Sequence, residues 1–287
     1  MYYAHKENKG GFPEPVRAHL YETAALTAKF TSVWGREAEG KATGLVHDVG
    51  KYSDLFRDVL DGKAQHVDHA TPGAAAFLMR YQAAGVAGAL AIQGHHDGLQ
   101  IGVSSHLKQL LKMKEPVSPQ NKTYSCRDIP ALLEWLKKDG LELPETIESD
   151  YPAEYKAHRP VAAMLYVRML FSALVDADFL ATEAHYASHR EGQYCYRPVG
   201  ATLAPLSLLT SLLNYVDTLQ KTSRAHHELN SLRSDLFTTC LNAGKKPKGI
   251  YTLTAPTGAG KTLAMMAFAL QHALQHKLRR FIFVLPY

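Results

Sequence analysis

Apolar and small residues recur at helical spacing in three stretches of the first part of this chain. The spacing predicts helices over Pro15–Trp34 and Ala74–Ile92 and a long helix over Val161–Tyr186. Ser104–Ser149 is more polar and contains several prolines, so we expect this segment to leave the core in short pieces. No strand pattern of comparable strength comes before Gly249. The first domain is therefore expected to be mostly α, as an all-helical bundle.

The hydrophobic pattern changes towards the C-terminal end of the chain. Helical spacing continues over Leu203–Leu241, and a cluster of glycine, lysine and proline follows it. Apolar, β-branched runs at Ile250–Thr254 and Phe281–Leu285 predict strands, and the amphipathic stretch Thr262–His276 between them predicts a helix. This βαβ order is typical of a parallel α/β sheet, which we expect to be begun here and not finished.

Length and composition bound the number of domains and the class of protein. With 287 residues, 46% of them hydrophobic, we expect a complete domain at residues 1–205 and part of another at residues 206–287. No apolar run approaches the roughly 20 residues of a membrane span and the start lacks a secretory signal, which favours a cytoplasmic protein with no membrane partner. The cysteines lie far apart, which argues against a disulfide framework. A net charge of +5 is compatible with a polyanionic partner.

The sharpest motif of the first domain is the adjacent pair His47 and Asp48, followed by Lys51. An imidazole and a carboxylate side by side can bind one divalent cation, and the second carboxylate oxygen can bridge to another, which is the minimal core of a two-metal phosphodiesterase. Lys51 could then contact the phosphate. Taken alone, such a dipeptide is more often an exposed pair than a metal site. His47, Asp48 and Lys51 are therefore predicted as catalytic residues only in combination with further ligands.

Further candidate ligands stand among small or apolar residues and not on charged faces. His19 lies within the first predicted helix, and His69 precedes small residues that let a helix approach closely. The adjacent His95 and His96 have glycines on either side, so both imidazoles could turn towards one point. The remaining histidines occupy polar or helix-surface contexts and are assigned no chemistry: His66, His106, His158, His185, His189, His226, His227, His272 and His276.

The long predicted helix carries two aspartates that cannot face the same way. Asp178 shares one face with apolar residues by the i, i+3, i+4 rule, whereas Asp176 points nearly opposite. We therefore predict Asp178 as the ligand. One alternative is an exposed aspartate here, with Asp176 as an N-cap-like or ion-pairing residue. The other is that Asp176 is the ligand in place of Asp178.

The order of these residues along the chain resembles that of the HD nuclease domain of the CRISPR type I nuclease-helicase, and the resemblance covers essentially the whole chain. It implies an HD-domain bundle with two divalent transition metals, drawn from Mn, Fe, Co and Ni, which suit nitrogen and oxygen ligands. The implied ligands of one metal are His19, His47, Asp48 and Asp178, and those of the other are Asp48, His69, His95 and His96. The opening of the chain also resembles that family, which places His5 near the site without making it a ligand.

A second motif, Thr254–Thr262, lies between a predicted strand and a predicted helix, which is the context of a Walker A phosphate loop. The residues expected to hold the phosphates and the magnesium ion are Gly258, Gly260, Lys261 and Thr262. Ala255 stands where many such loops have glycine, a form that resembles superfamily 2 helicases and implies a RecA-like segment that binds ATP with Mg. We expect a truncated motor with negligible ATP hydrolysis, because no Walker B acid follows the loop.

Together the motifs predict a metal-dependent nuclease that cleaves single-stranded DNA by two-metal phosphodiester hydrolysis. A single strand can thread into a recessed site, whereas a duplex about 20 Å wide cannot. The resemblance implies CRISPR type I interference, in which an RNA-guided surveillance complex would be the recruiting partner. The alternatives are an HD-type nucleotide phosphohydrolase, against which the phosphate loop argues, and a non-catalytic nucleotide-binding module whose histidines pack in the core.

Overall fold

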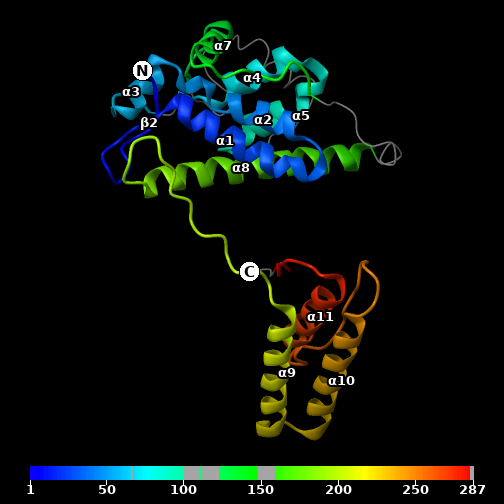
Figure 1. Cartoon of the computed structure of the whole chain (residues 1–287). Coiled ribbons are helices and arrows are strands. Elements are labelled where there is room, and N and C mark those ends of the chain that lie inside the picture. Colours follow the sequence, from blue (N-terminus) through cyan, green and yellow to red (C-terminus); the bar gives the residue numbers. More distant parts are fainter. Residues whose placement is uncertain (66, 100–109, 111–122, 148–158, 285–287) are drawn as a thin grey trace. The chain divides into compact units, whose positions relative to one another are not determined.

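The computed structural model describes residues 1–65, 67–99, 110, 123–147 and 159–284, and helices dominate these residues (Figure 1). The chain divides into two compact units, Met1–Arg197 and Pro198–Tyr287. The border therefore precedes the one predicted between residues 205 and 206. The reason is that residues 198–204, which form no helix, group with the second unit.

The first unit is mostly helical, as predicted. Its α-helices are α1 (Val16–Thr31), α2 (Glu37–Val46), α3 (Asp54–Leu60), α4 (Ala70–Tyr81), α5 (Val86–Gly94), α7 (Ile129–Lys138) and α8 (Arg159–Ala187). Short 3-10 helices are η1 (Ser32–Trp34), η2 (Val49–Lys51) and η3 (Gln82–Gly85). The expectation of a domain without strands was wrong in detail, because two pairs of very short strands are present: β1 (Tyr3–His5) with β2 (Glu14–Pro15), and β3 (Val67–Asp68) with β4 (Thr123–Tyr124).

The core of this unit forms where α1, α2, α4, α5 and α8 pack on one another. Figure 1 shows α8 running alongside α1, which it contacts. The largest fully buried apolar side chains come from these five helices and from α7: Leu20, Leu45, Phe77, Ile92, Leu132, Leu136, Leu170 and Leu174. Burying each such side chain contributes about 1.5–3 kcal/mol relative to leaving it exposed. The predicted metal ligands therefore lie within or next to the helices that form this core.

Two glycines allow the backbone to approach closely beside the predicted motif. A Cβ atom at Gly73 in α4 would lie 2.1 Å from the carbonyl oxygen of Val46, and one at Gly50 would lie 2.3 Å from the carbonyl oxygen of His69. Any side chain at either position would force the segments apart. The start of α4 therefore sits directly against the end of α2, which brings His47 and His69 into one neighbourhood.

The predicted helices are found with one substantial correction. Pro15–Trp34 is realised as α1 and η1, and the long helix is α8. The single helix expected over Ala74–Ile92 is instead α4, η3 and α5, because Gln82 adopts a φ of 50° and ends α4. Of the predicted excursion Ser104–Ser149, the structure describes residue 110 and residues 123–147. Its described part contains α7, whose N-terminus is capped by the Asp128 side chain.

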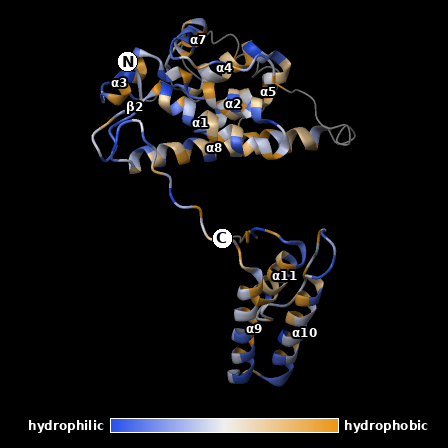
Figure 2. Ribbon diagram, in the orientation of Figure 1, coloured by the Kyte–Doolittle hydropathy of each residue, from blue (hydrophilic) through white to orange (hydrophobic). Residues whose placement is uncertain are grey.

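Two segments are long and apolar enough, by length and composition alone, to cross a membrane: Ala70–Gly94 and Pro160–Ala187. The first comprises α4, η3 and α5 and is 61% buried within the protein, while the second is 22% buried. Apolar positions recur along α8 (Figure 2). Core helices of soluble proteins meet the same criterion, so these segments do not by themselves indicate a membrane protein.

The second unit is built from α9 (Pro205–Thr222), α10 (His227–Ala243) and α11 (Lys261–His276). A small core forms where α11 packs on α9 and α10, with Leu209, Phe237 and Leu270 among its buried side chains. The strands predicted at 250–254 and 281–285 are not formed by the described residues of those segments. A strand is stabilised by hydrogen bonds to a neighbouring strand, and among the described residues neither segment has one. The α/β character predicted here is therefore reduced to a loop and a helix.

Candidate functional site

The structure brings all the predicted metal ligands to one place, mostly from the ends of helices. His19 lies within α1 and Asp178 within α8, whereas His47 and Asp48 directly follow α2. His69 caps the N-terminus of α4, and His95 and His96 follow α5. These ends converge because α1, α2, α4, α5 and α8 share one core.

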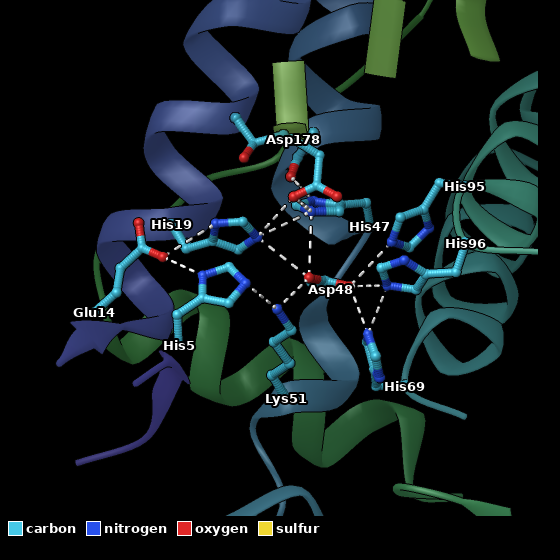
Figure 3. Close-up of polar contacts among 12 residues, drawn as sticks. His5, Glu14, His19, His47, Asp48, Lys51, His69, His95, His96 and Asp178 are labelled. Carbon is cyan, nitrogen blue, oxygen red and sulfur yellow. Dashed lines mark hydrogen bonds and ion pairs between the residues drawn. The ribbon is translucent and has the colours of Figure 1, made fainter. Parts of the chain in front are cut away.

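Asp48 lies at the centre of the cluster, and its two oxygens face different sets of imidazoles (Figure 3). Oδ2 is 3.2 Å from His19 Nε2 and 3.4 Å from His47 Nε2. Oδ1 is 3.3 Å from the Nε2 atoms of both His69 and His95 and 4.0 Å from His96 Nε2. A carboxylate fully buried between two sets of imidazoles has the geometry of a bridging ligand.

Two ligand groups share Asp48, and each could hold a divalent ion. One is formed by His19, His47, Asp48 and Asp178, and the other by Asp48, His69, His95 and His96, with the ligand atoms of each group within 4.8 Å of one another. In the first group Asp178 Oδ1 lies 3.4 Å from His19 Nε2 and 3.6 Å from His47 Nε2. Neighbouring ligands of one ion stand about 3 Å apart when each metal–ligand bond is about 2.1 Å. Small shifts of side chains would therefore complete either group.

The hydrogen bonds of two imidazoles leave the correct nitrogen free for a metal. His47 Nδ1 donates to the carbonyl oxygen of Gly44 at 2.8 Å, and His95 Nδ1 donates to that of Ile92 at 2.6 Å. In a neutral imidazole the other nitrogen, Nε2, then carries a lone pair, and in both residues Nε2 faces Asp48. Hydrogen bonds of this kind are the usual way in which metal-binding histidines are oriented.

Unpaired buried atoms at the same point are a further sign that the cluster fits a cation. Asp48 Oδ1 and His95 Nε2 are both buried and have no hydrogen-bond partner among the described residues. Leaving such an acceptor buried and unpaired costs about 1–3 kcal/mol. A divalent ion between them would satisfy both, so the residues present fit the two-metal site.

The charges of the site keep its aspartates ionised. Burial acts to raise the pKa of Asp48, but the Lys51 ammonium and the imidazoles of His47 and His69 hold that pKa well below its usual value. Burial lowers the pKa of His19 to about 4, so this imidazole is neutral near pH 7. Burial likewise acts to lower the pKa of His95, but the Asp48 carboxylate raises it above the usual value. The first group thus offers ionised carboxylates and at least one neutral imidazole, the forms in which these side chains bind metals.

No protein-family model matches the chain, and no curated protein matches it. What the site can do therefore follows from its own donor set. Nitrogen and oxygen ligands without thiolates suit Mn, Fe, Co, Ni and Zn. A pair of such ions on a shared carboxylate is an arrangement found in enzymes that hydrolyse phosphate esters.

The choice of Asp178 over Asp176 is supported by burial. Asp178 is 7% exposed and lies in the cluster, whereas Asp176 is exposed to solvent. Burial acts to raise the pKa of Asp178, but the hydrogen bond to His47 and the nearby His19 lower it far below the usual value. The surface context expected for His185 was wrong, because its ring is buried and its Nε2 contacts the carbonyl oxygen of Lys6 at 3.0 Å. His66, His106 and His158 lie outside the described residues.

Lys51 and His5 occupy the edge of the first ligand group. Lys51 is buried, with Nζ 2.7 Å from Asp48 Oδ2 and 3.4 Å from His5 Nε2. Burial and the Lys51 ammonium lower the pKa of His5 to about 3. Glu14, whose side chain is 1% exposed, binds His5 from the other side and was missed in the sequence, because only the pairing of β1 with β2 brings it here.

The two glycines of the predicted phosphate loop adopt left-handed backbone conformations. Gly258 and Gly260 adopt φ angles of 83° and 81°, which side chains disfavour, and α11 begins at Lys261. Lys261 Nζ donates to the carbonyl oxygens of Ala255 at 2.9 Å and Pro256 at 3.0 Å. Arg233 of α10 donates two hydrogen bonds to the carbonyl oxygen of Gly258. Thr262 is exposed in the first turn of α11, where its hydroxyl is accessible to a ligand.

Proposed function

We propose that the first unit is a metal-dependent nuclease that hydrolyses phosphodiester bonds of single-stranded DNA. The observation that carries the proposal is the buried carboxylate of Asp48, whose two oxygens face separate groups of imidazoles. When bound there, two divalent ions would supply Lewis-acid chemistry, lowering the pKa of a water molecule and offsetting charge on phosphate oxygens.

The residues of the chain would hold the two ions, orient the imidazoles and neutralise charge. Asp48 keeps the two groups at a fixed separation, since both depend on one side chain. His47 and His95 are oriented by hydrogen bonds to backbone carbonyls. The Lys51 ammonium, 2.7 Å from Asp48 Oδ2, would offset negative charge that develops when a phosphate binds at the centre.

The exposure of the ligands indicates the side from which a substrate would arrive. The side chains of His19, His47 and His95 are fully buried, whereas those of His69 and His96 are 16% and 40% exposed. A phosphodiester would therefore reach the cluster over His69 and His96. A flexible single strand can follow a recessed path of this kind more easily than a stiff duplex.

The second unit would bind ATP with Mg through Gly258, Gly260, Lys261 and Thr262. A cleft of about 410 Å³ beside the loop, lined in part by Arg233 and Asn230, could admit the rest of a nucleotide. In this proposal the unit is the start of a superfamily 2 helicase motor. The motor would feed the nuclease with a strand displaced by an RNA-guided surveillance complex.

The test is cleavage of a single-stranded oligonucleotide by the unaltered chain and by Asp48→Ala, with Mn, Fe, Co, Ni or Mg added. The proposal expects metal-dependent cutting that Asp48→Ala abolishes. Equal cutting by both proteins would contradict the bridging role of Asp48. Hydrolysis of nucleotides without cutting of oligonucleotides would instead favour a nucleotide phosphohydrolase.

A further inference from the structure

The N-terminal hairpin carries a buried carboxylate to the edge of the metal centre. His5 of β1 and Glu14 of β2 are partners in the strand register. Asn8 Oδ1 accepts hydrogen bonds from the backbone N–H groups of Gly10 and Phe12 and so closes the turn between the strands. Glu14 is 1% exposed, so its charge depends on the partners that it meets inside the protein.

Each oxygen of Glu14 has its own partners, and Figure 3 shows those of Oε2. Oε1 accepts a hydrogen bond from the Tyr194 hydroxyl at 2.6 Å, which anchors the side chain. Oε2 accepts a hydrogen bond from His5 Nδ1 at 2.5 Å and lies 3.5 Å from His19 Nδ1. His19 Nδ1 is buried and has no hydrogen-bond partner among the described residues, so Glu14 is the charged group that it faces.

His5, Glu14 and His19 are close enough to be considered as a separate metal site. The distance between His5 Nδ1 and Glu14 Oε2 argues against an ion there. At 2.5 Å it is the length of a hydrogen bond, whereas two ligands of one ion stand about 3 Å apart. The contact therefore fits a hydrogen bond from His5 Nδ1 to Glu14 better than a shared ion.

The charge of Glu14 favours a proton on the nitrogen of each imidazole that faces it. A negative oxygen favours an N–H on the nearest nitrogen, and Glu14 Oε2 faces Nδ1 of both His5 and His19. His19 Nε2 also faces carboxylate oxygens, those of Asp48 at 3.2 Å and Asp178 at 3.4 Å, but a cation held by these carboxylates and Nε2 would leave Nδ1 as the place for the proton. His19 Nε2 then points its lone pair at the first ligand group. His5 Nε2 then accepts from Lys51 Nζ at 3.4 Å, and Lys51 in turn contacts Asp48 at 2.7 Å.

We infer that Glu14 is a positioning residue of the metal centre: one buried carboxylate sets the tautomers of His19, a ligand, and of His5, which holds Lys51 against Asp48. The inference rests on the proposed two-metal site. The N-terminal hairpin would then contribute to metal binding by orienting a ligand and not by binding an ion itself. The Nδ1 atoms of His47 and His95 donate to backbone carbonyls instead. Among the described ligands with such a contact, His19 is therefore the one whose Nδ1 partner can be changed by replacing a single side chain.

The experiment measures the binding of Mn²⁺ to the metal-free full chain by titration calorimetry, for the unaltered protein, Glu14→Gln and Glu39→Gln. Glu39 is the matched control, since it is also 1% exposed and also accepts a tyrosine hydroxyl, that of Tyr166, but contacts no predicted ligand. Glu14→Gln is expected to lower the affinity for one of the two ions by about 10–100-fold and to leave the affinity for the other unchanged. Changes to residues that hydrogen-bond to a metal ligand have effects of this size. Glu39→Gln is expected to bind both ions as the unaltered chain does.

The outcomes separate this inference from the proposed function. Two ions bound with equal affinity by the unaltered chain and by Glu14→Gln would overturn the inference alone. Three ions falling to two in Glu14→Gln would also overturn it, because Glu14 would then be a ligand. No binding by the unaltered chain would overturn both. If Glu14→Gln does not fold, Glu14→Asp keeps the charge but withdraws the oxygen from His19, and the same weakening of one ion is expected.

Discussion

Lys51 and Asp48 form an ion pair with almost no access to solvent, and replacing Lys51 by Met removes one half of it. The two side chains are 4% and 0% exposed and their charged atoms are 2.7 Å apart. Removing one partner of a buried pair leaves the other charge uncompensated, at a cost of about 3–5 kcal/mol. For a unit of this size, each kcal/mol lowers the melting temperature by about 2–4 °C, so a fall of roughly 6–20 °C is expected in metal-free protein.

Thermal unfolding of metal-free protein, followed by circular dichroism, measures this effect. Lys63→Met is the control, because Lys63 pairs with Asp61 at 2.8 Å but the two side chains are 67% and 45% exposed, so water already solvates both charges. The control should have the same melting temperature as the unaltered protein. Saturating Mn²⁺ should recover most of the loss in Lys51→Met, since a cation bound to Asp48 replaces the missing charge. Equal melting of Lys51→Met and Lys63→Met in metal-free protein would refute the electrostatic account of Asp48.

Three further predictions follow from the site and its surroundings. Asp178→Ala should lower oligonucleotide cleavage at limiting Mn²⁺ by at least about 10-fold, whereas Asp176→Ala should not, and a larger loss from the latter would overturn the helix-face argument. Burial raises the pKa of Glu39 to about 7, so the native state holds a proton there that the unfolded state releases above about pH 4.5, and stability is lost as the pH rises through 7. Glu39→Gln should therefore be more stable than the unaltered protein by up to about 3 kcal/mol at pH 8 and by less than about 1 kcal/mol at pH 5 in urea unfolding, and equal gains at both would contradict this. Lys261→Ala should weaken Mg-ATP binding about 10-fold or more in a fluorescence titration, while Lys248→Ala should not, and equal affinities would argue against the phosphate loop.

Much of the helical fold could be predicted because helices carry their pattern locally. The spacing of apolar residues was enough to predict α1 and α8, and to predict that the face of α8 with Asp178 is buried. The break at Gln82 could not be predicted, since Ala-rich spacing continues through it and only the packing of α4 on α5 requires the turn. The strands predicted at 250–254 and 281–285 are not formed by the described residues of these segments, for a related reason. A β-branched composition favours an extended backbone, but a strand forms only where another strand pairs with it.

The ligands could be proposed from the sequence because their residue types are rare in apolar surroundings. His19 and His95 stood out as histidines beside small or apolar residues, and both are buried in the cluster. Glu14 gave no such indication. It follows a Gly-Gly-Phe-Pro stretch that reads as a loop, and its contact with His5 depends on a hairpin of very short strands. The partners of a metal ligand are therefore harder to find in a sequence than the ligand itself.

The most direct test of the account is the number of transition-metal ions that each chain holds. Metal-free protein would be reconstituted with Mn²⁺, freed of excess ion and analysed for its elements, beside Asp48→Ala treated in the same way. The account predicts two ions per chain in the unaltered protein and at most one in Asp48→Ala, because both ligand groups share that carboxylate. An unaltered chain that retains no ion, or an Asp48→Ala variant that retains two, would contradict it.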